Sequence, residues 1–290
     1  MSEQRVGLAL SSGGARGAAH VGVLKVLAAH EIRPDVIAGS SMGAQVGGLF
    51  ACGLPLNEME SLWRSSSFRQ VFRTLLPTIP WSGWSSGSGI TRLLRKLIGD
   101  PQIQELSVQF AAVATDLQSG QPVPITSGSL VEAIRASISV PGLFNPVWID
   151  NHLLIDGGVS NPAPVDIARQ LGADLVIGVD VLVDPAEVEF SGIPYIEARA
   201  RDLARAEGPG SPSGNGRKFH PSVFAVLFQM STVFQKRLAD LQLSTNPPDI
   251  LIRPDFSADP PCYSDVGCGI EAGEEAARQA LPKILQLLDR

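Results

Sequence analysis

The chain has 290 residues, of which 44% are hydrophobic, and it carries a formal net charge of −6. That length and hydrophobic content are enough to bury a substantial core, and they suit one large α/β domain or two small ones. The negative charge argues against general binding to nucleic acids and against overall attraction to anionic membranes.

The first 53 residues repeat a pattern of strand, glycine-rich turn and helix. An apolar strand at 6–10 precedes a turn and helix at 13–30, and a short strand at 34–40 precedes a second turn and a helix closed by Gly53. Alternating strands and helices predict a parallel sheet with helices on its faces.

The alternation continues along the rest of the chain, and no internal repeat is visible. Further predicted elements are strands at 108–117, 151–158, 173–182 and 249–255, and helices at 131–137, 166–172 and 269–288. We therefore expect a single domain over residues 1–290. Within it, residues 208–216 contain only Gly, Pro, Ser and Asn, which predicts a flexible loop.

The cysteines and the N-terminal sequence indicate the cellular compartment in which the protein is expected. Three cysteines, an odd number in a long chain, do not indicate a disulfide framework, so we expect a reducing compartment. Cys262 and Cys268 lack a second pair or a nearby histidine, and we interpret them as small loop or helix residues and not as zinc ligands. We expect no signal peptide and no membrane span. The expected location is the cytoplasm, and peripheral contact with a membrane stays open.

The stretch Gly39-Ser40-Ser41-Met42-Gly43 lies between an apolar strand and a helical pattern. A serine in such a turn can act as a nucleophile when small neighbours leave its oxygen exposed, and glycines at −2 and +2 meet that need. Ser41 would then stand at a helix N-terminus, where backbone amides favour developing negative charge. The alternative is a turn in which Ser40 or Ser41 caps the helix.

The first turn, SGGARG at residues 12–17, offers a second part of an acyl-transfer site. Consecutive glycines allow the amides of Gly13, Gly14 and Ala15 to point at an anion, as a tetrahedral oxyanion requires. This turn lacks the G-x-G-x-x-G spacing of a dinucleotide-binding loop, and it lacks the G-K-[ST] sequence of a Walker-type loop. The remaining alternative is a turn that packs its helix tightly.

A serine nucleophile needs a group to take its proton, and none of the four histidines is convincing. His20 and His30 fall in the first helix and are interpreted as structural, His152 precedes a strand, and His220 borders the predicted loop. Asp156 ends an apolar strand, which places a carboxylate at the active edge of a parallel sheet. Asp156 could therefore take the proton directly, as a dyad, although a simple D-G turn is the alternative.

Three motifs in this order resemble bacterial members of the patatin-like phospholipase family. They are SSGGARGAAHVGVLKVL (11–27), GSSMGA (39–44) and DGG (156–158). The segments at 133–147 and 154–180 are also similar to that family, so the resemblance covers most of the chain.

The resemblance implies a three-layer α/β/α sandwich with a mainly parallel central sheet and no catalytic histidine. By position, Ser41 matches the family's nucleophile and Asp156 its dyad base. The residues that match the oxyanion turn are Gly13, Gly14, Ala15 and Arg16. The turn departs from the family at its start, where this chain has Ser12 in place of a glycine.

We therefore predict a serine acyl hydrolase of lipid esters, similar to a phospholipase or lysophospholipase, that forms an acyl-Ser41 intermediate. The lipid substrate is what the resemblance implies, whereas the residues alone indicate acyl transfer through a serine. The expected partner is a lipid or small ester, with no cofactor, metal or nucleic acid. An acyltransferase with the same nucleophile elbow and a non-catalytic regulatory member of the family stay open as alternatives.

Residues 57–100 read as irregular and form a candidate lid or entrance. They contain Trp81 and Trp84, and by count six basic residues against three acidic ones. Tryptophan and basic residues favour a lipid surface, so this segment is expected to contact lipid. The alternative is that the tryptophans fill the core.

Overall fold

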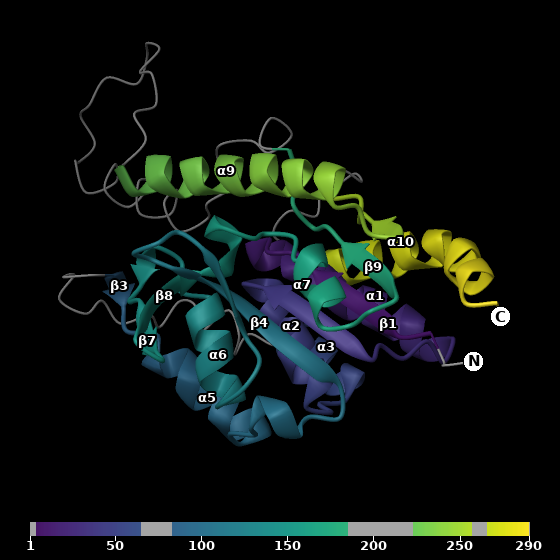
Figure 1. The fold of residues 1–290 in the computed structure, drawn as a ribbon, viewed down its shortest axis with the longest axis horizontal. Helices are drawn as coiled ribbons and strands as arrows, with labels where there is room; N and C mark the ends of the chain where they lie inside the picture. The colour runs from purple at the N-terminus through teal and green to yellow at the C-terminus, as the bar shows by residue number, and fades with distance from the viewer. Residues whose placement is uncertain (1–3, 65–82, 185–222, 257–265, 290) are drawn as a thin grey trace, which may run out of the picture.

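The computed structural model describes four stretches of the chain, residues 4–64, 83–184, 223–256 and 266–289. The predicted loop at 208–216, Trp81 and His220 lie outside the described residues. Within them, strands and helices alternate as the sequence pattern predicts (Figure 1).

One eight-stranded sheet forms the centre of the described structure. Its strands are β1 (Val6–Leu10), β2 (Val36–Ser40), β4 (Gln109–Asp116), β5 (Pro122–Ile125), β7 (Val147–Ile149), β8 (His152–Asp156), β9 (Leu175–Val179) and β10 (Ile250–Ile252). Their order is β10-β9-β1-β2-β4-β8-β7, and β5 pairs with β4 off this path. The strands from β10 to β4 pair in parallel, whereas β5, β8 and β7 pair antiparallel. A separate parallel pair joins β3 (Gly83–Ser85) to β6 (Gly142–Phe144).

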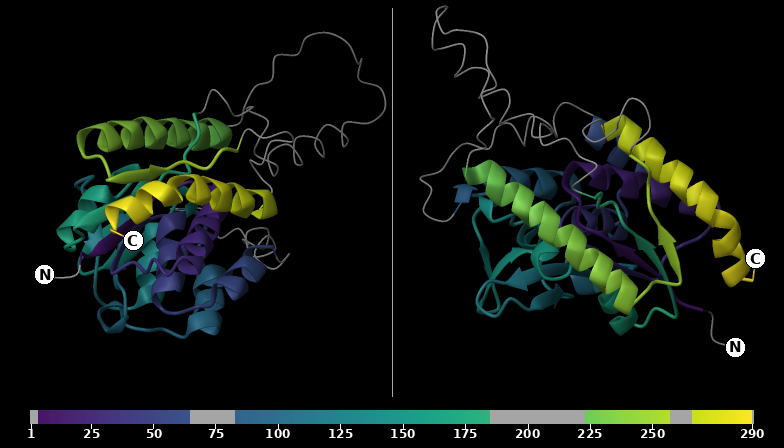
Figure 2. Two further views of the ribbon diagram at one scale, coloured as in Figure 1. Left: turned by 90° about the vertical axis from the view of Figure 1, so that its right-hand side faces the viewer. Right: turned by 90° about the horizontal axis from the view of Figure 1, so that it is seen from above.

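Helices cover both faces of this sheet. They are α1 (Ala18–Ala29), α2 (Met42–Ala51), α3 (Leu56–Arg64), α5 (Ser88–Ile98), α6 (Leu130–Ser137), α7 (Val165–Gln170), α9 (Val223–Thr245) and α10 (Val266–Leu287). The 3-10 helices are η1 (Gly14–Gly17), η2 (Ile103–Glu105) and η3 (Gly157–Val159). Side chains of α1, α2, α6 and α10 pack on one face, and those of α7 and α9 on the other. Figures 1 and 2 show how these helices are arranged around the sheet. The predicted three-layer α/β/α sandwich with a mainly parallel sheet is confirmed.

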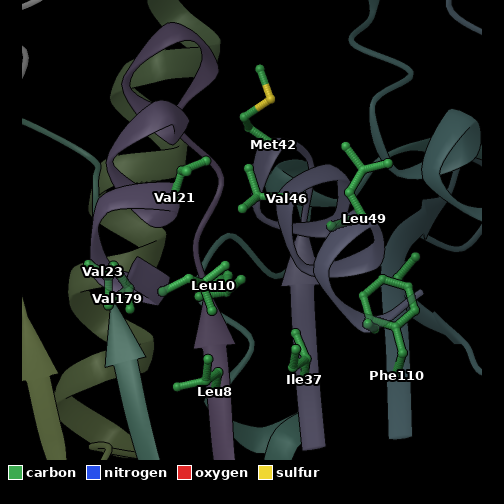
Figure 3. Close-up of a cluster of buried hydrophobic side chains, with 14 of the residues drawn as sticks. Leu8, Leu10, Val21, Val23, Ile37, Met42, Val46, Leu49, Phe110 and Val179 are labelled. Carbon is green, nitrogen blue, oxygen red and sulfur yellow. The ribbon is translucent and has the colours of Figure 1, made fainter. Parts of the chain in front are cut away.

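The two faces of the sheet differ in the size of their side chains. Toward α1 and α2 the central strands present large residues such as Leu8, Ile37 and Phe110, which lie side by side in Figure 3. Burying each of these side chains stabilises the fold by about 1.5–3 kcal/mol. Toward α7 and α9 the same strands present small residues, among them Ala38 and Ala111. The helices of that second face can therefore approach the sheet closely.

Residues 57–100 are not wholly irregular, so that expectation is wrong for their described parts. Helix α3 buries Met59 and Trp63, and helix α5 buries Ile90 and Leu94. Each pair is four residues apart, which places both side chains on one face of a helix. Two of the segment's basic residues also form ion pairs with nearby acids, at 2.8 Å in Arg64–Glu60 and 3.2 Å in Arg95–Asp100.

Two further features were not predicted. Helix α9 spans 23 residues, yet no helix was expected between 182 and 249. Cys268, in α10, is disulfide-bonded, and Cys52 is free. An odd number of cysteines argues against a framework of bridges, but it does not prevent a single local one. In the described parts of the chain, no helix combines the length and apolar composition that crossing a bilayer demands.

Candidate active site

Strand β4 brings the carboxyl ends of β2 and β8 together. Val113 of β4 pairs with Ser40 of β2, and the next residue, Ala114, pairs with Asp156 of β8. Strand β5 pairs with a stretch of β4 that overlaps both the part paired with β2 and the part paired with β8. Because β5 occupies one edge of β4 along this stretch, β2 and β8 must both lie along the other edge. Because β2 runs parallel to β4 and β8 antiparallel, their ends approach head-on. Ser41, which follows β2, therefore meets Asp156.

A hydrogen bond joins these two residues. The Ser41 hydroxyl donates to Oδ2 of Asp156 at 2.6 Å. The other carboxylate oxygen, Oδ1, accepts from the backbone amide of Gly158 at 2.8 Å. Asp156 is buried, whereas 8% of Ser41 is exposed at the surface of the site. The carboxylate is thus held from two sides, with one oxygen directed at the serine.

Burial sets the proton affinity of this carboxylate. Removal from water raises the pKa of Asp156 from 3.8 to about 6, while the hydrogen bonds from Ser41 and Gly158 act in the opposite direction. At neutral pH the group is therefore mostly ionised and able to accept a proton. A base is most effective when its pKa lies near the working pH.

The backbone at Ser41 is strained. Its φ of 52° and ψ of −115° lie in a region that favours glycine, and such a conformation costs of order 1–3 kcal/mol. The flanking glycines make the sharp turn sterically feasible. A Cβ at Gly39 would lie 2.5 Å from the backbone of Gly43, and one at Gly43 would lie 2.2 Å from the carbonyl oxygen of Leu10. The observed turn matches the predicted elbow between β2 and α2.

The end of helix α6 supports both members of the pair. The Ser41 amide donates to the Ser137 hydroxyl at 2.9 Å, and that hydroxyl donates to the Val113 carbonyl at 2.5 Å. The Asp156 amide donates to the carbonyl of Ser139 at 3.0 Å. Sequence reasoning missed these roles. The segment at 133–147 was singled out by resemblance, but spacing does not show which of its residues contact the site.

A buried arginine stiffens this supporting segment. Arg135 donates to the Ser139 hydroxyl at 2.6 Å and to the carbonyls of Ser86 and Asn145, each at 2.9 Å. Burial lowers the pKa of Arg135 to about 10, which leaves it charged at neutral pH. The arginine thereby ties α6 to β3 and to the loop before β7.

The predicted oxyanion turn lies beside the elbow. A Cβ at Gly17 would lie 2.1 Å from Cγ of Met42, the residue after Ser41, so η1 and the start of α2 are in contact. Gly14 has a φ of 57° and is exposed. The amides of Gly13 and Gly14 have no acceptor within the described residues, as expected where a helix begins. Ala15 and Arg16 lie within η1 itself.

Ser12, the departure from the family pattern, needs no left-handed backbone, because it is not among the described residues with positive φ. Its hydroxyl donates to Oε1 of Gln235, in α9, at 2.9 Å. A Cβ at Gly158 would lie 2.7 Å from the same Oε1 atom. Gln235 therefore lies between the first turn and the turn after Asp156, and it places α9 beside the site.

None of the described histidines contacts the Ser41–Asp156 pair. His20 is buried, its Nε2 bonds the Ser11 carbonyl at 2.9 Å, and burial lowers its pKa to about 4, so it is neutral. His152 is half exposed and bonds Asp116 at 2.5 Å, and His30 bonds the carbonyl of Val26 at the end of α1.

A cavity of about 580 Å³ is lined by Arg5, Asp35 and Gln109, which lie at the amino ends of β1, β2 and β4. It is therefore at the opposite edge of the sheet from Ser41. Within the stretches that the structure describes, no group of three or more His, Cys, Asp or Glu is arranged to hold a metal ion.

Comparison with known proteins agrees with this geometry. Residues 8–169, more than half of the chain, match the family model described as patatin-like phospholipase. The chain belongs to the patatin-like phospholipase family. The matched range contains the first turn, the elbow at Ser41 and the turn at Asp156, so the resemblance seen in the sequence is confirmed.

Individual relatives of this patatin-like protein are longer than it is. An uncharacterised NTE family protein of Mycobacterium tuberculosis is 42% identical over 180 residues, covering 62% of this chain and 50% of the relative. Patatin-like phospholipase domain-containing protein 7 of Rattus norvegicus is 36% identical over 181 residues, covering 61% of this chain and 13% of the relative. The chain thus spans half or less of the length of these two proteins. Among solved structures, VipD from Legionella pneumophila is similar with a TM-score of 0.49 and 14% identity, covering 97% of this chain and 67% of VipD.

Proposed function

We propose that this patatin-like protein is a serine acyl hydrolase that cleaves carboxylic esters of lipids with Ser41 as nucleophile and Asp156 as base. The observation that carries the proposal is the 2.6 Å hydrogen bond from the Ser41 hydroxyl to the buried Asp156 carboxylate. A strained serine at a helix N-terminus supports it, as does a neighbouring turn whose Gly13 and Gly14 amides have no acceptor within the described residues.

The reaction runs in two halves. In the first, Asp156 takes the hydroxyl proton while Oγ of Ser41 attacks the ester carbonyl carbon, and the resulting oxyanion accepts hydrogen bonds from the amides of Gly13 and Gly14. Collapse of this intermediate breaks the ester bond, and Asp156 returns the proton to the leaving alcohol. The product of this half is an ester of Ser41.

In the second half, Asp156 takes a proton from water as the water oxygen attacks the acyl carbon of that ester. Collapse of the second tetrahedral intermediate releases a carboxylic acid, and the proton returns to Oγ of Ser41. Each group that these steps require is a side chain or amide of this chain, so the mechanism needs no cofactor.

The lipid class of the substrate comes from the family. One relative is named a patatin-like phospholipase domain-containing protein, and the matching model carries the same description. We also propose that β1 to α10 form one catalytic domain, because elements from both ends of the chain pack on the same sheet. A lid or entrance within 57–100 stays a prediction, since Trp81 and the side chain of Trp84 are not described.

The test is hydrolysis of a panel of p-nitrophenyl esters and lysophospholipids by the wild type and three variants. Ser41→Ala and Asp156→Asn should each lose activity by roughly 10⁴-fold or more. Ser40→Ala is the matched control, because Ser40 is the adjacent buried serine and its hydroxyl has no described hydrogen-bond partner. An active Ser41→Ala variant, or an inactive Ser40→Ala variant that is still folded, would overturn the assignment.

A further inference from the structure

Exposed apolar side chains gather on one side of the described structure. Of the nine exposed large hydrophobic residues in the described parts of the chain, five lie on α9 and three lie in or just after β4, β7 and β8. We call these eight residues the apolar face; they are Leu117, Trp148, Val159, Val226, Leu227, Met230, Phe234 and Leu241. The ninth, Leu287, lies at the end of α10. A concentration of this kind marks an interaction surface more often than scattered single residues do.

Helix α9 contributes a continuous stripe. Leu227, Met230, Phe234 and Leu241 are spaced by three, four and seven residues, so they follow one side of the helix. Phe234 is 62% exposed. The opposite side of α9 carries Ala239, which is buried against the sheet. In Figures 1 and 2, α9 is the outermost described helix on this side of the molecule.

The sheet extends the stripe beyond the helix. Trp148 of β7 pairs with Leu153 of β8, and the carbonyl of Leu153 accepts a hydrogen bond from the amide of Leu117. Leu154 is buried against the face covered by α6, so its neighbour Leu153 and the paired Trp148 point to the face of α9. Trp148 is 69% exposed and Leu117 49%.

The charges of α9 fit a lipid surface. Its one acidic residue, Asp240, is paired with Lys236 at 2.7 Å and faces Arg253 at 3.6 Å. Arg237 is exposed at the border of the stripe. Helix α9 therefore presents one exposed cation, Arg237, at the border of the stripe, and its single acid is paired. Anionic lipid headgroups attract such a cation, and acyl chains accept the aromatic and aliphatic side chains.

The apolar face is also continuous with the catalytic site. Gln235, one residue from Phe234, bonds Ser12 at the oxyanion turn. Val159 lies in η3, three residues after Asp156, and the carbonyl of the following Ser160 accepts a hydrogen bond from Gln242 of α9 at 3.1 Å. A helix is about 10 Å wide, so a surface touching the outer side of α9 would lie close to Ser41.

We propose that the apolar face docks the protein on a lipid bilayer, with α9 lying along the membrane surface. This inference rests on the proposed function, because it explains how a lipid ester reaches Ser41 from a membrane. Helix α9 is about 35 Å long at 1.5 Å per residue, and helices of this kind bury their apolar side about 5–10 Å into the interface. It places the contact on α9 and the β7–β8 hairpin, and the lid or entrance within 57–100 stays a separate prediction.

The test measures co-sedimentation with vesicles of phosphatidylcholine and phosphatidylglycerol in equal amounts. All proteins carry Ser41→Ala, so that no lipid is consumed during binding. The variant is Met230→Gln with Phe234→Gln, and the matched control is Leu287→Gln, an exposed apolar residue away from this face. We expect the double variant to lose vesicle affinity by about tenfold or more, since it removes two large side chains from the contact, and the control to keep it.

Three results would overturn the docking proposal. The first is that the parent protein does not bind vesicles. The second is that the double variant binds vesicles as tightly as the parent, and the third is that the Leu287→Gln control loses as much vesicle affinity as the double variant. A parent that is dimeric by light scattering and becomes monomeric in the double variant would assign the face to a second copy instead. The double variant without Ser41→Ala should hydrolyse a soluble short-chain ester at the wild-type rate. If the wild type binds vesicles but hydrolyses no ester, the proposed function fails while the docking stands.

Discussion

Replacing Asp156 by asparagine should abolish activity and at the same time stabilise the protein at neutral pH. Asparagine has the same shape and can still accept from the Gly158 amide, and its NH2 group can donate to Oγ of Ser41. It removes the negative charge that burial makes costly. The same feature that makes Asp156 an effective base should therefore reduce the stability of the wild type.

The size of this effect follows from the pKa of Asp156, which burial raises from 3.8 to about 6. Well below pH 3.8 the carboxyl group is protonated in both the folded and the unfolded state, and burial carries no charge penalty. Above pH 6 it is ionised in both states, and the folded state bears a cost of about 3 kcal/mol, from roughly two pKa units at 1.36 kcal/mol each. Wild-type stability relative to the variant should thus fall as pH rises from about 4 to about 6.

The assay is thermal or urea unfolding of both proteins at several values between pH 4 and pH 8. At pH 7.5 the variant should melt roughly 6 °C higher, since 1 kcal/mol shifts the melting temperature of a chain of this size by about 2 °C. At pH 4 the difference should shrink toward zero. His20 titrates in both proteins, so its contribution cancels. A difference that does not change with pH, or a variant less stable at pH 7.5, would refute the reasoning.

Three other predictions concern the same site. The wild-type kcat/KM should fall tenfold per pH unit below an apparent pKa near 6, and a limb centred near 4 would contradict the raised pKa of Asp156. Ser41→Gly should be more stable in urea than Ser41→Ala by about 1 kcal/mol or more, because glycine adopts the φ of 52° without strain; equal midpoints would contradict a strained elbow. Ser137→Ala should lower kcat with KM nearly unchanged, because the Ser41 amide loses its acceptor, and wild-type kcat in that variant would rule out a positioning role.

The sequence reveals those parts of the fold and site that depend on local pattern. The glycines around Ser41 and the apolar run before it predict a strand, a turn and a helix without knowledge of the rest of the chain. The pairing of Ser41 with Asp156 is different, because 115 residues separate them, and only the register of β2 and β8 on β4 brings them together. Its position at a strand end and the lack of a convincing histidine made Asp156 a candidate base, and the family resemblance matched it to Ser41.

The features that were missed depend on long-range packing. Helix α9 escaped notice because it has apolar residues on both sides, with Leu243 buried and Phe234 exposed, so it lacks a clear amphipathic period. A run of 23 residues without glycine or proline was the signal that could have found it. Ser137 could not be found in this way, because its partner Ser41 is 96 residues away in the sequence.

The most direct test of the account is the site of covalent labelling by a fluorophosphonate, determined by mass spectrometry of peptides from the labelled wild-type protein. Such a reagent phosphonylates an activated serine, and we propose that the Asp156 carboxylate, which accepts the Ser41 hydroxyl hydrogen bond, activates Ser41. The account predicts one adduct, on Ser41, that forms far more slowly in Asp156→Asn. An adduct on Ser40 or another serine, or undiminished labelling of Ser41 without Asp156, would contradict the Ser41–Asp156 mechanism.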